Sequence, residues 1–289
     1  MKYVESPLNY IGSKYKLLNQ ILPLLPKNIN TFVDLFAGGC NVGINVSANK
    51  IIFNDNTPHL VSIYEMLKNQ PISTTLQQIN RVIMHHKLSK NNKETFLKYR
   101  DYINNKDKEP IDILVAIFYS FNNQIRWNSK GDYMTTSGKN RSSFNSSLRT
   151  KMINFVSKLQ KINCEFSDKD FRDFDFSILD EKDFVYADPP YFLGDVDYSR
   201  QSGWNAEVEK ELYDKFLHLH NKGIKFAISN VLEHKGKFNK FLDEWVNENN
   251  FNMIFLNKQY DNACYCAVKK SNSQEVLVTN YLVKRNRLF

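Results

Sequence analysis

The sequence predicts an α/β fold, with a Rossmann-like mixed sheet as the core and a mainly helical domain inserted into it. Three observations lead to this prediction. An apolar strand at 31–36 runs into a glycine turn, and a second short strand follows at 51–53. Helical patterns alternate with polar stretches over 58–163, and the alternation of strands and helices returns after Cys164. Strand–helix–strand units imply parallel strands joined by right-handed crossovers.

The first part of the core is expected to begin with a helix at 17–25, which stops at a proline. The strand at 31–36 then ends in the turn Ala37-Gly38-Gly39, and a helix at 42–48 leads to the strand at 51–53. This order of elements is one βαβ unit.

The inserted segment, residues 58–163, has a different pattern of apolar and polar residues from the core. Its helical patterns are separated by polar runs, and the stretch at 122–147 is rich in Asn, Ser, Gly, Lys and Arg, which is typical of an exposed loop or hairpin. Two domains are therefore expected. Residues 1–57 and 164–289 form the core, and residues 58–163 form the insert with its basic hairpin at about 122–147.

The second part of the core is expected to complete the sheet. Glycine at position 223 ends the first of its helices. The expected strands are 184–187, 225–229, 264–268 and 276–281, and the expected helices are 207–221 and 237–249.

Composition narrows the class of protein. Lys and Arg number 39 against 31 Asp and Glu, so the net charge is +8 and the pI is about 9.1. This excess fits a polyanionic partner, and it also fits many ordinary basic proteins. Residues 1–7 contain no apolar signal core, and no apolar run reaches about 18 residues. We therefore expect a cytoplasmic protein that does not span a membrane.

The cysteines predict neither disulfides nor a metal site. None of them forms a C-x-x-C pair, and their spacing does not match a zinc site. Four reduced thiols and no bound metal are expected. The cysteines are Cys40, Cys164, Cys264 and Cys266.

The glycine turn at 37–39 and the acid at the end of the next strand, Asp55, suggest a nucleotide-like cofactor. Glycine allows the backbone to approach a ligand closely, and an acid at this place in an α/β sheet can bind ribose hydroxyls. The turn does not follow the pattern G-x-G-x-x-G, so a dinucleotide is disfavoured. Two other interpretations stay open: a purely structural turn, and Asp55 as a helix N-cap.

The motif Asp188-Pro189-Pro190-Tyr191 follows the apolar strand at 184–187 directly. Two prolines fix the backbone and remove two amide donors. They can hold a carboxylate and a phenol rigidly at the end of the strand. A fixed acceptor such as Asp188 suits chemistry on an aromatic amine, whose lone pair must be freed from the ring, and Tyr191 can stack on a base.

With these motifs in place, the sequence resembles the Dam-type family (alpha group, D12 class) of DNA adenine-N6 methyltransferases of bacteria and phages, over nearly its whole length. The order of motifs is similar to the family's alpha arrangement, with the insert before D-P-P-Y. One departure is Cys40, where many members have a third glycine. The segments that resemble family motifs are Pro7–Lys14, Asp34–Gly39, Asp55, Ser167–Phe171, Asp188–Tyr191 and Gly223–Asn230.

The resemblance implies a methyltransferase core that binds S-adenosyl-L-methionine. Lys14 would contact the carboxylate of this cofactor, Asp55 its ribose hydroxyls, and Asp188 the target amine near the cofactor. Because the cofactor's sulfonium makes the methyl group electrophilic, the protein mainly positions the two reactants, and no metal is needed. The other implied cofactor residues are Tyr10, Phe36, Gly38, Asp170 and Phe171.

The basic insert is expected to contact double-stranded DNA. Between 120 and 160 there are seven Lys and Arg residues against a single acid, and such residues bind phosphates. The segment at 121–132 resembles the family's recognition hairpin, in which Arg126 would read a guanine and Gln124 or Ile125 would enter the gap left by the flipped base. GATC is the usual target in the family and is therefore the first expected site. The other expected DNA-binding residues are Asn128, Lys139 and Arg141.

Competing interpretations keep the same motifs but change the substrate. Methylation of a cytosine amine, of RNA or of a glutamine side chain uses similar chemistry, and Asp at position 188 favours adenine among them. A DNA-binding protein that has lost catalysis is a further alternative, which the intact set Lys14, Asp55 and D-P-P-Y disfavours. A cognate restriction enzyme in the same system is a candidate partner.

Overall fold

The computed structural model describes residues 3–10, 12–128, 131–192, 203–256 and 273–283. The chain divides into two compact units. The first unit comprises residues 1–15, 38–45 and 55–168, and the second comprises residues 16–37, 46–54 and 169–289. The expected strand at 264–268, with Cys264 and Cys266, lies outside the described residues.

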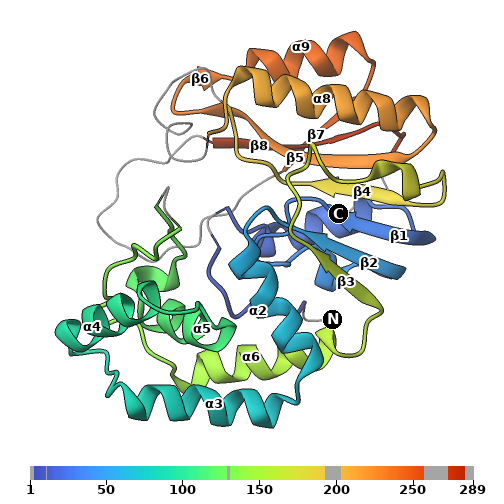
Figure 1. The fold of residues 1–289 in the computed structure, drawn as a ribbon. Coiled ribbons are helices and arrows are strands. Elements are labelled where there is room, and N and C mark those ends of the chain that lie inside the picture. The colour runs from blue at the N-terminus through green and yellow to red at the C-terminus, as the bar shows by residue number, and fades with distance from the viewer. Residues whose placement is uncertain (1–2, 11, 129–130, 193–202, 257–272, 284–289) are drawn as a thin grey trace. The chain divides into compact units, whose positions relative to one another are not determined.

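The second unit contains a mixed sheet, as predicted. Strand β1 (Ile29–Asp34) pairs in parallel with β2 (Ala48–Asn54) and with β4 (Phe184–Ala187). Strand β4 pairs in parallel with β5 (Lys225–His234). The sheet continues with β8 (Ser273–Thr279), which is antiparallel to both β5 and β7 (Asn252–Leu256) (Figure 1).

The parallel strands β1, β2 and β4 are buried where apolar residues predominate, and the buried parts of β1 and β2 each end in one polar residue. All four residues of β4 are buried, as are the last three residues of β1 and the last four of β2. Such continuous burial is typical of parallel strands. The helices α8 (Ala206–Asn221) and α9 (Lys240–Glu248) both contact β5, and they meet where Tyr213 and Trp245 stack with ring centroids 4.4 Å apart (Figure 1).

The first unit is mainly helical. Its helices are α2 (Pro58–Asn69), α3 (Ile72–His85), α4 (Lys93–Asn104), α5 (Pro110–Tyr119) and α6 (Ser146–Leu159). Helix α5 contacts α2, α3 and α4, and its residues 113–119 are all buried. The short strand β3 (Cys164–Ser167) contacts α2. Within the described residues, no helix combines the length and the apolar character that a membrane span requires.

The bounds of the first unit differ from those expected for the insert, because N-terminal residues join its helices. Asn9 donates from Nδ2 to the backbone oxygen of Asn122 at 2.8 Å, and Lys151 forms an ion pair with Glu5 at 2.7 Å. The functional division into a cofactor domain (1–57 and 164–289) and a DNA-recognition domain (58–163) stays a prediction.

The prediction of a helix at 42–48 is wrong. Only the single 3-10 turn η3 (Gly43–Asn45) forms there, and β2 already begins at Ala48. The side chain of Asn45 binds both backbone groups of Val4 at 2.9 and 2.8 Å, and it also donates to the backbone oxygen of Asn41. Asparagine side chains that bind backbone groups in this way compete with helix formation.

The helix expected at 237–249 begins three residues late, at Lys240. Residues Lys237–Phe238 instead form β6, which pairs antiparallel with β5. Lys235 and Gly236 between the two strands have φ of 51° and 79°. Two consecutive residues with positive φ are typical of a tight hairpin turn. The helix expected at 17–25 is divided into η1 (Tyr15–Leu17), α1 (Leu18–Ile21) and η2 (Leu22–Leu24).

Candidate active site

In the first unit, the glycine turn that follows β1 along the chain packs against Tyr10. Gly38 has a φ of +46°, in the left-handed region that favours glycine. A Cβ added there would lie 2.8 Å from Cδ1 of Tyr10, so the absence of a side chain lets the ring reach the backbone. Cys40 also has a positive φ, of 56°. This conformation accounts for the glycine that many family members carry at the position of Cys40.

Asp55 holds the same turn from the other side. Its carboxylate accepts hydrogen bonds from the backbone N of Gly38 at 2.9 Å and of Thr57 at 3.1 Å. The side chain is only 8% exposed. Burial raises the pKa of Asp55, and the bonds from Thr57 and Gly38 oppose that rise. Because the N-cap of α2 is Thr57, Asp55 is not the helix cap that the sequence left as an alternative.

Tyr10 and Lys14 lie in the same unit as Gly38 and Asp55. Lys14 is 3% exposed, and its Nζ donates to the backbone oxygen of Gly12 at 2.9 Å. Asn41 donates to the hydroxyl of Ser13 at 3.1 Å, which ties the N-terminal motif to the glycine turn. The first unit therefore brings together four of the expected cofactor residues.

The other expected cofactor residues belong to the second unit, where Asn54 joins the segment before Phe36 to the segment before Asp170 and Phe171. This buried residue ends β2, and its amide donates to the backbone oxygens of Leu35 at 3.0 Å and Lys169 at 2.9 Å. The backbone N of Lys169 donates back to its Oδ1 at 3.2 Å. As a result Phe36 and Phe171 meet, with ring centroids 5.7 Å apart.

Phe171 and Asp170 differ in their surroundings. Phe171 is 3% exposed and belongs to the apolar core, whereas Phe36 is partly buried against that core. Asp170 accepts bonds from the Arg172 guanidinium at 2.7 and 3.0 Å, and this interaction lowers the pKa of Asp170. Asp170 is thus an ionised acceptor at the surface.

Asp188 and Tyr191 form a bonded pair after β4. The Tyr191 hydroxyl donates to Oδ1 of Asp188 at 2.8 Å. Burial and the Asp188 carboxylate hold the pKa of Tyr191 well above its usual range. Pro189 is buried and Pro190 is exposed. Since β4 lies between β1 and β5, this pair stands at the carboxyl edge of the parallel strands, where ligands bind in open α/β sheets.

The expected recognition segment forms an irregular hairpin in the first unit. Antiparallel bridges join Ser120 to Ser137 and Trp127 to Tyr133, and the Met134 backbone N donates to the oxygen of Arg126 at 2.9 Å. The Arg126 side chain is exposed, as are Lys139 and Arg141. All three cations are therefore accessible to a polyanion.

Gln124, Ile125 and Asn128 are half-buried in this hairpin. The backbone oxygen of Gln124 accepts bonds from Ser120, Tyr133 and Thr135 at 3.0 to 3.2 Å. The Asn128 side chain closes the turn through two bonds with Asp132. The main chain at these positions is thus firmly held, and the exposed apolar side chains of the hairpin are Phe121 (41%) and Met134 (51%).

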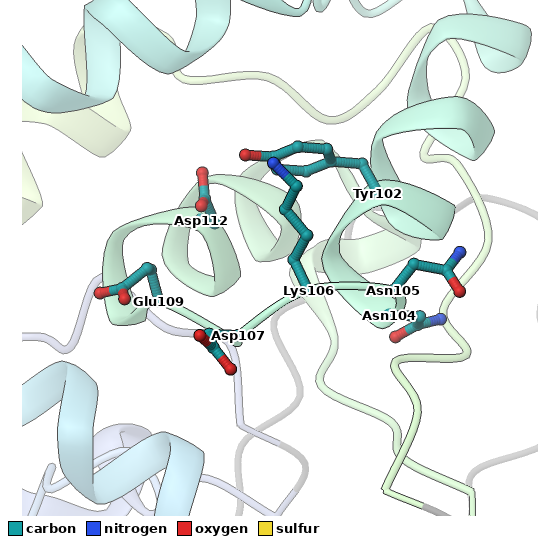
Figure 2. Close-up of a pocket in the computed structure, with 7 residues that line it drawn as sticks. All are labelled: Tyr102, Asn104, Asn105, Lys106, Asp107, Glu109 and Asp112. Carbon is teal, nitrogen blue, oxygen red and sulfur yellow. The ribbon is translucent and has the colours of Figure 1, made fainter.

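Asn104 ties the hairpin to α4. It exchanges two hydrogen bonds with the backbone of Tyr133, at 3.1 and 2.8 Å. Asn104 also lines an open polar pocket at the junction of α4 and α5 (Figure 2). Its lining contains none of the expected cofactor residues. The pocket is lined by Tyr102, Asn104, Asn105, Lys106, Asp107, Glu109 and Asp112.

Sequence reasoning assigned no role to several residues that organise these sites. Each of them contacts a residue distant in the chain: Asn54 bonds Lys169, Asn104 bonds Tyr133, Trp204 packs on Phe36, and Glu209 bonds Asn230. Of these four residues, only Asn54 has a signal in the local sequence that could have indicated its role, because it is a polar residue at the end of an apolar strand. Among the residues that the structure describes, no group of three or more His, Cys, Asp or Glu side chains is arranged to hold a metal ion.

A mixed α/β sheet with an aspartate–tyrosine pair directly after β4 and a buried acid, Asp55, directly after β2 is typical of an enzyme that binds a nucleotide-like cofactor. The family model described as D12 class N6 adenine-specific DNA methyltransferase matches residues 10–262. The chain belongs to this family, and the resemblance stated from its motifs is confirmed.

Three relatives illustrate the similarity. The modification methylase StsI of Streptococcus sanguinis is 45% identical over 287 residues, which are 98% of this chain and 44% of that protein. The type II methyltransferase M.FokI of Planomicrobium okeanokoites is 44% identical, over 96% of this chain and 43% of its own length. The DNA adenine methylase of Escherichia coli strain K12 is 26% identical over 66% of each chain. The chain thus spans less than half the length of the first two relatives.

Proposed function

We propose that the chain transfers a methyl group from S-adenosyl-L-methionine to the N6 amine of an adenine flipped out of duplex DNA. One observation carries the proposal. In a chain of the D12 class, the buried strand β4 is followed directly by Asp188-Pro189-Pro190-Tyr191, and the Tyr191 hydroxyl holds the Asp188 carboxylate at 2.8 Å.

Asp188 is the proposed acceptor for the target amine. A carboxylate offers about four acceptor positions, so Asp188 can hold the Tyr191 phenol and an adenine N–H together. Accepting that N–H draws the nitrogen lone pair away from the ring and makes it nucleophilic. Formation of the N–CH3 bond would break the bond between the methyl group and the cofactor's sulfur, with S-adenosylhomocysteine as the leaving group. The nitrogen would then lose one proton, which Asp188 can accept and pass to solvent. The ring of Tyr191 stacks on the base.

S-adenosyl-L-methionine, when bound, supplies an electrophilic methyl group on a positively charged sulfur. The residues present fit this cofactor in charge and shape. Asp55 offers a buried carboxylate for ribose hydroxyls, and Lys14 offers a buried ammonium for the cofactor's carboxylate. Gly38, which lacks a Cβ, leaves room for the ring of Tyr10 beside the turn. The ionised Asp170 is the proposed acceptor for the amine of the cofactor's adenine, beside Phe36 and Phe171.

The hairpin at 120–137, together with the basic residues that follow it, is the proposed DNA-recognition element. Arg126 reads a guanine, and the exposed Lys139 and Arg141 bind phosphates, while Asn128 keeps its proposed place beside the DNA. Gln124 and Ile125 remain the residues proposed to enter the gap left by the flipped adenine. The exposed Phe121 and Met134 of the hairpin are two further candidates, because apolar wedges of these types separate base steps in other complexes.

The target site and the cellular partner are finer parts of the proposal. GATC is the first site to test. The relatives include a DNA adenine methylase at 26% identity and modification or type II enzymes at 44–45% identity, so the test must extend beyond GATC. A cognate restriction enzyme is the proposed partner, since two of these relatives are named for modification or as type II methyltransferases.

A methylation assay with an unbiased readout tests the proposal. The 289-residue chain is incubated with tritiated S-adenosyl-L-methionine and unmethylated plasmid, and modified adenines are mapped by sequencing. We expect label in DNA, and N6-methyladenine within one short sequence. Label at GATC alone would support the first expected site, and label at another sequence would replace it. Cofactor binding without label in any DNA would overturn the proposal and move the substrate to RNA or protein.

A further inference from the structure

Trp204 completes an aromatic cluster with two of the expected cofactor residues. Its ring centroid lies 5.7 Å from that of Phe36, at an interplanar angle of 79°, and 5.6 Å from that of Phe171, at 51°. Phe36 and Phe171 are themselves 5.7 Å apart. Each of the three rings thus contacts the other two. Trp204 is 6% exposed. We call these residues the Phe36–Phe171–Trp204 cluster.

Glu209, in the first turn of α8, anchors the indole of this cluster. Its Oε2 accepts a hydrogen bond from Nε1 of Trp204 at 2.5 Å. Its Oε1 accepts bonds from the Tyr213 hydroxyl at 2.5 Å and from Nδ2 of Asn230 at 3.3 Å. The side chain has no exposed surface. A buried carboxylate is costly unless donors satisfy it, and three donors from three segments do so here.

The anchor also reaches the strand beside D-P-P-Y. Asn230 lies on β5, which pairs in parallel with β4 so that Ile228 is opposite Ala187. Ser229 and Asn230 therefore belong to the part of β5 that extends beyond the end of β4, where Asp188 begins. Glu209 connects this edge of the sheet to the cluster around Phe36, which comes two residues after β1.

We propose that Trp204 and Glu209 are positioning residues for the cofactor's adenine: Glu209 holds the indole of Trp204, and the indole holds Phe36 and Phe171 in the geometry that binds S-adenosyl-L-methionine. This inference rests on the proposed function for the identity of the ligand. It predicts that cofactor affinity depends on two residues outside the motifs that the sequence indicated.

The test compares matched tryptophan substitutions. W204F removes the indole N–H that Glu209 accepts and shrinks the ring against Phe36 and Phe171. W245F makes the same change in the same apolar core, where Trp245 stacks on Tyr213 at 4.4 Å and contacts Phe226 and Phe251. Isothermal titration gives Kd for S-adenosyl-L-methionine and S-adenosylhomocysteine, and thermal unfolding of the ligand-free chain gives the stability of each variant.

We expect W204F to weaken binding of both compounds by about 10-fold, from the loss of aromatic contacts and of their fixed geometry. W245F should leave Kd within about 2-fold of wild type, although both variants lower the melting temperature. E209Q keeps the volume of the anchor and should weaken binding in the same direction as W204F. A similar loss of stability in W204F and W245F, with no change of Kd in W204F, would overturn the inference and leave Trp204 as a core residue only.

Tryptophan emission provides a second readout that does not depend on the variants' affinity. The chain has three tryptophans, so W127F/W245F keeps only Trp204, and W127F/W204F keeps only Trp245. Saturating S-adenosylhomocysteine should change the emission of the first chain and not of the second. Equal responses would contradict the inference. A wild-type chain that binds neither compound would instead overturn the proposed function, so the two failures are distinguishable.

Discussion

Replacement of Asp188 gives the most direct test of the proposed chemistry. In Asp188→Ala the target amine loses its charged acceptor, and the Tyr191 hydroxyl loses the partner that it holds at 2.8 Å. A hydrogen bond to a charged group contributes about 1.5–3 kcal/mol, which corresponds to roughly 10- to 150-fold in rate at about 1.4 kcal/mol per tenfold. Positioned acid–base groups contribute about 10²- to 10⁴-fold. We therefore expect a fall in the methylation rate of at least about 100-fold.

Asp188→Asn separates the charge from the shape of this group. Its amide oxygen can still accept the Tyr191 hydroxyl, but it carries no charge to stabilise the departing proton, and its NH2 group is a donor. The rate should therefore fall nearly as far as in Asp188→Ala, while the melting temperature stays closer to wild type.

The assay is single-turnover transfer of labelled methyl to a duplex oligonucleotide, with enzyme in excess and with Kd for cofactor and DNA measured separately. Asp183→Asn is the matched control. Asp183 is a buried carboxylate at the opposite end of β4, where it accepts a bond from the Thr31 backbone N at 2.7 Å. It should cost stability and leave the rate of the folded enzyme unchanged. Transfer by Asp188→Ala within about 3-fold of wild type would refute the acceptor role, because the charge-assisted bond alone is expected to exceed that factor.

Three further predictions test the cofactor turn, the DNA hairpin and the buried anchor. Gly38→Ala should weaken cofactor binding and lower the melting temperature, because its Cβ would meet the Tyr10 ring at 2.8 Å and its φ is +46°. Gly223→Ala is the control, because this position has a φ of +76° and no atom within 4 Å, so the substitution introduces backbone strain alone. Equal losses of cofactor affinity in the two variants would argue against the close approach at Gly38. Arg126→Ala should cost about 1–3 kcal/mol in DNA binding and relax discrimination at one base pair. Lys139→Ala should weaken binding evenly across sequences and reduce the slope of log K against log salt concentration by about 1. Filter binding across salt concentrations and a panel of duplexes measures both effects, and the reverse pattern would show that the two roles are exchanged. Burial raises the pKa of Glu209 above its usual value of 4.5. The stability that the folded state gains from this shift is fully present below the pKa of Glu209 in the unfolded chain, and it is lost as pH rises through the pKa in the folded chain. The melting temperature of E209Q relative to wild type should therefore increase as pH rises above 4.5, the usual value for this carboxyl group. A constant difference would show that Glu209 does not titrate in this way.

Local sequence was sufficient for the parts of the site that depend on neighbours along the chain. Phe184–Ala187 is a run of apolar residues that forms β4 as expected, and the two prolines after Asp188 end it. The glycine turn after β1 likewise depends on backbone conformation, which Gly38 adopts at positive φ. Each of these features is determined within a few residues, so a pattern in the sequence can predict it.

Where local sequence was wrong, distant contacts overrode it. The apolar pattern at 42–48 predicted a helix, but the side chain of Asn45 binds the backbone of Val4, 41 positions away. The segment directly before α9 forms the strand β6 and not the first turn of the helix, because Lys237 and Phe238 pair with His234 and Glu233 of β5. In both places, a hydrogen bond to a partner outside the segment outweighs a weak local preference for helix.

The sequence by itself determined the class of fold, the aspartate–tyrosine motif and the chemistry that these residue types support, because periodicity, turns and side-chain type are local properties. Tertiary structure alone decided that Asn54 joins Leu35 to Lys169, that Asn104 holds the hairpin at Tyr133, and that Glu209 anchors Trp204 beside Phe36. The physical reason is that a buried polar group must find its partners in space, and strand order and packing determine which residues those partners are.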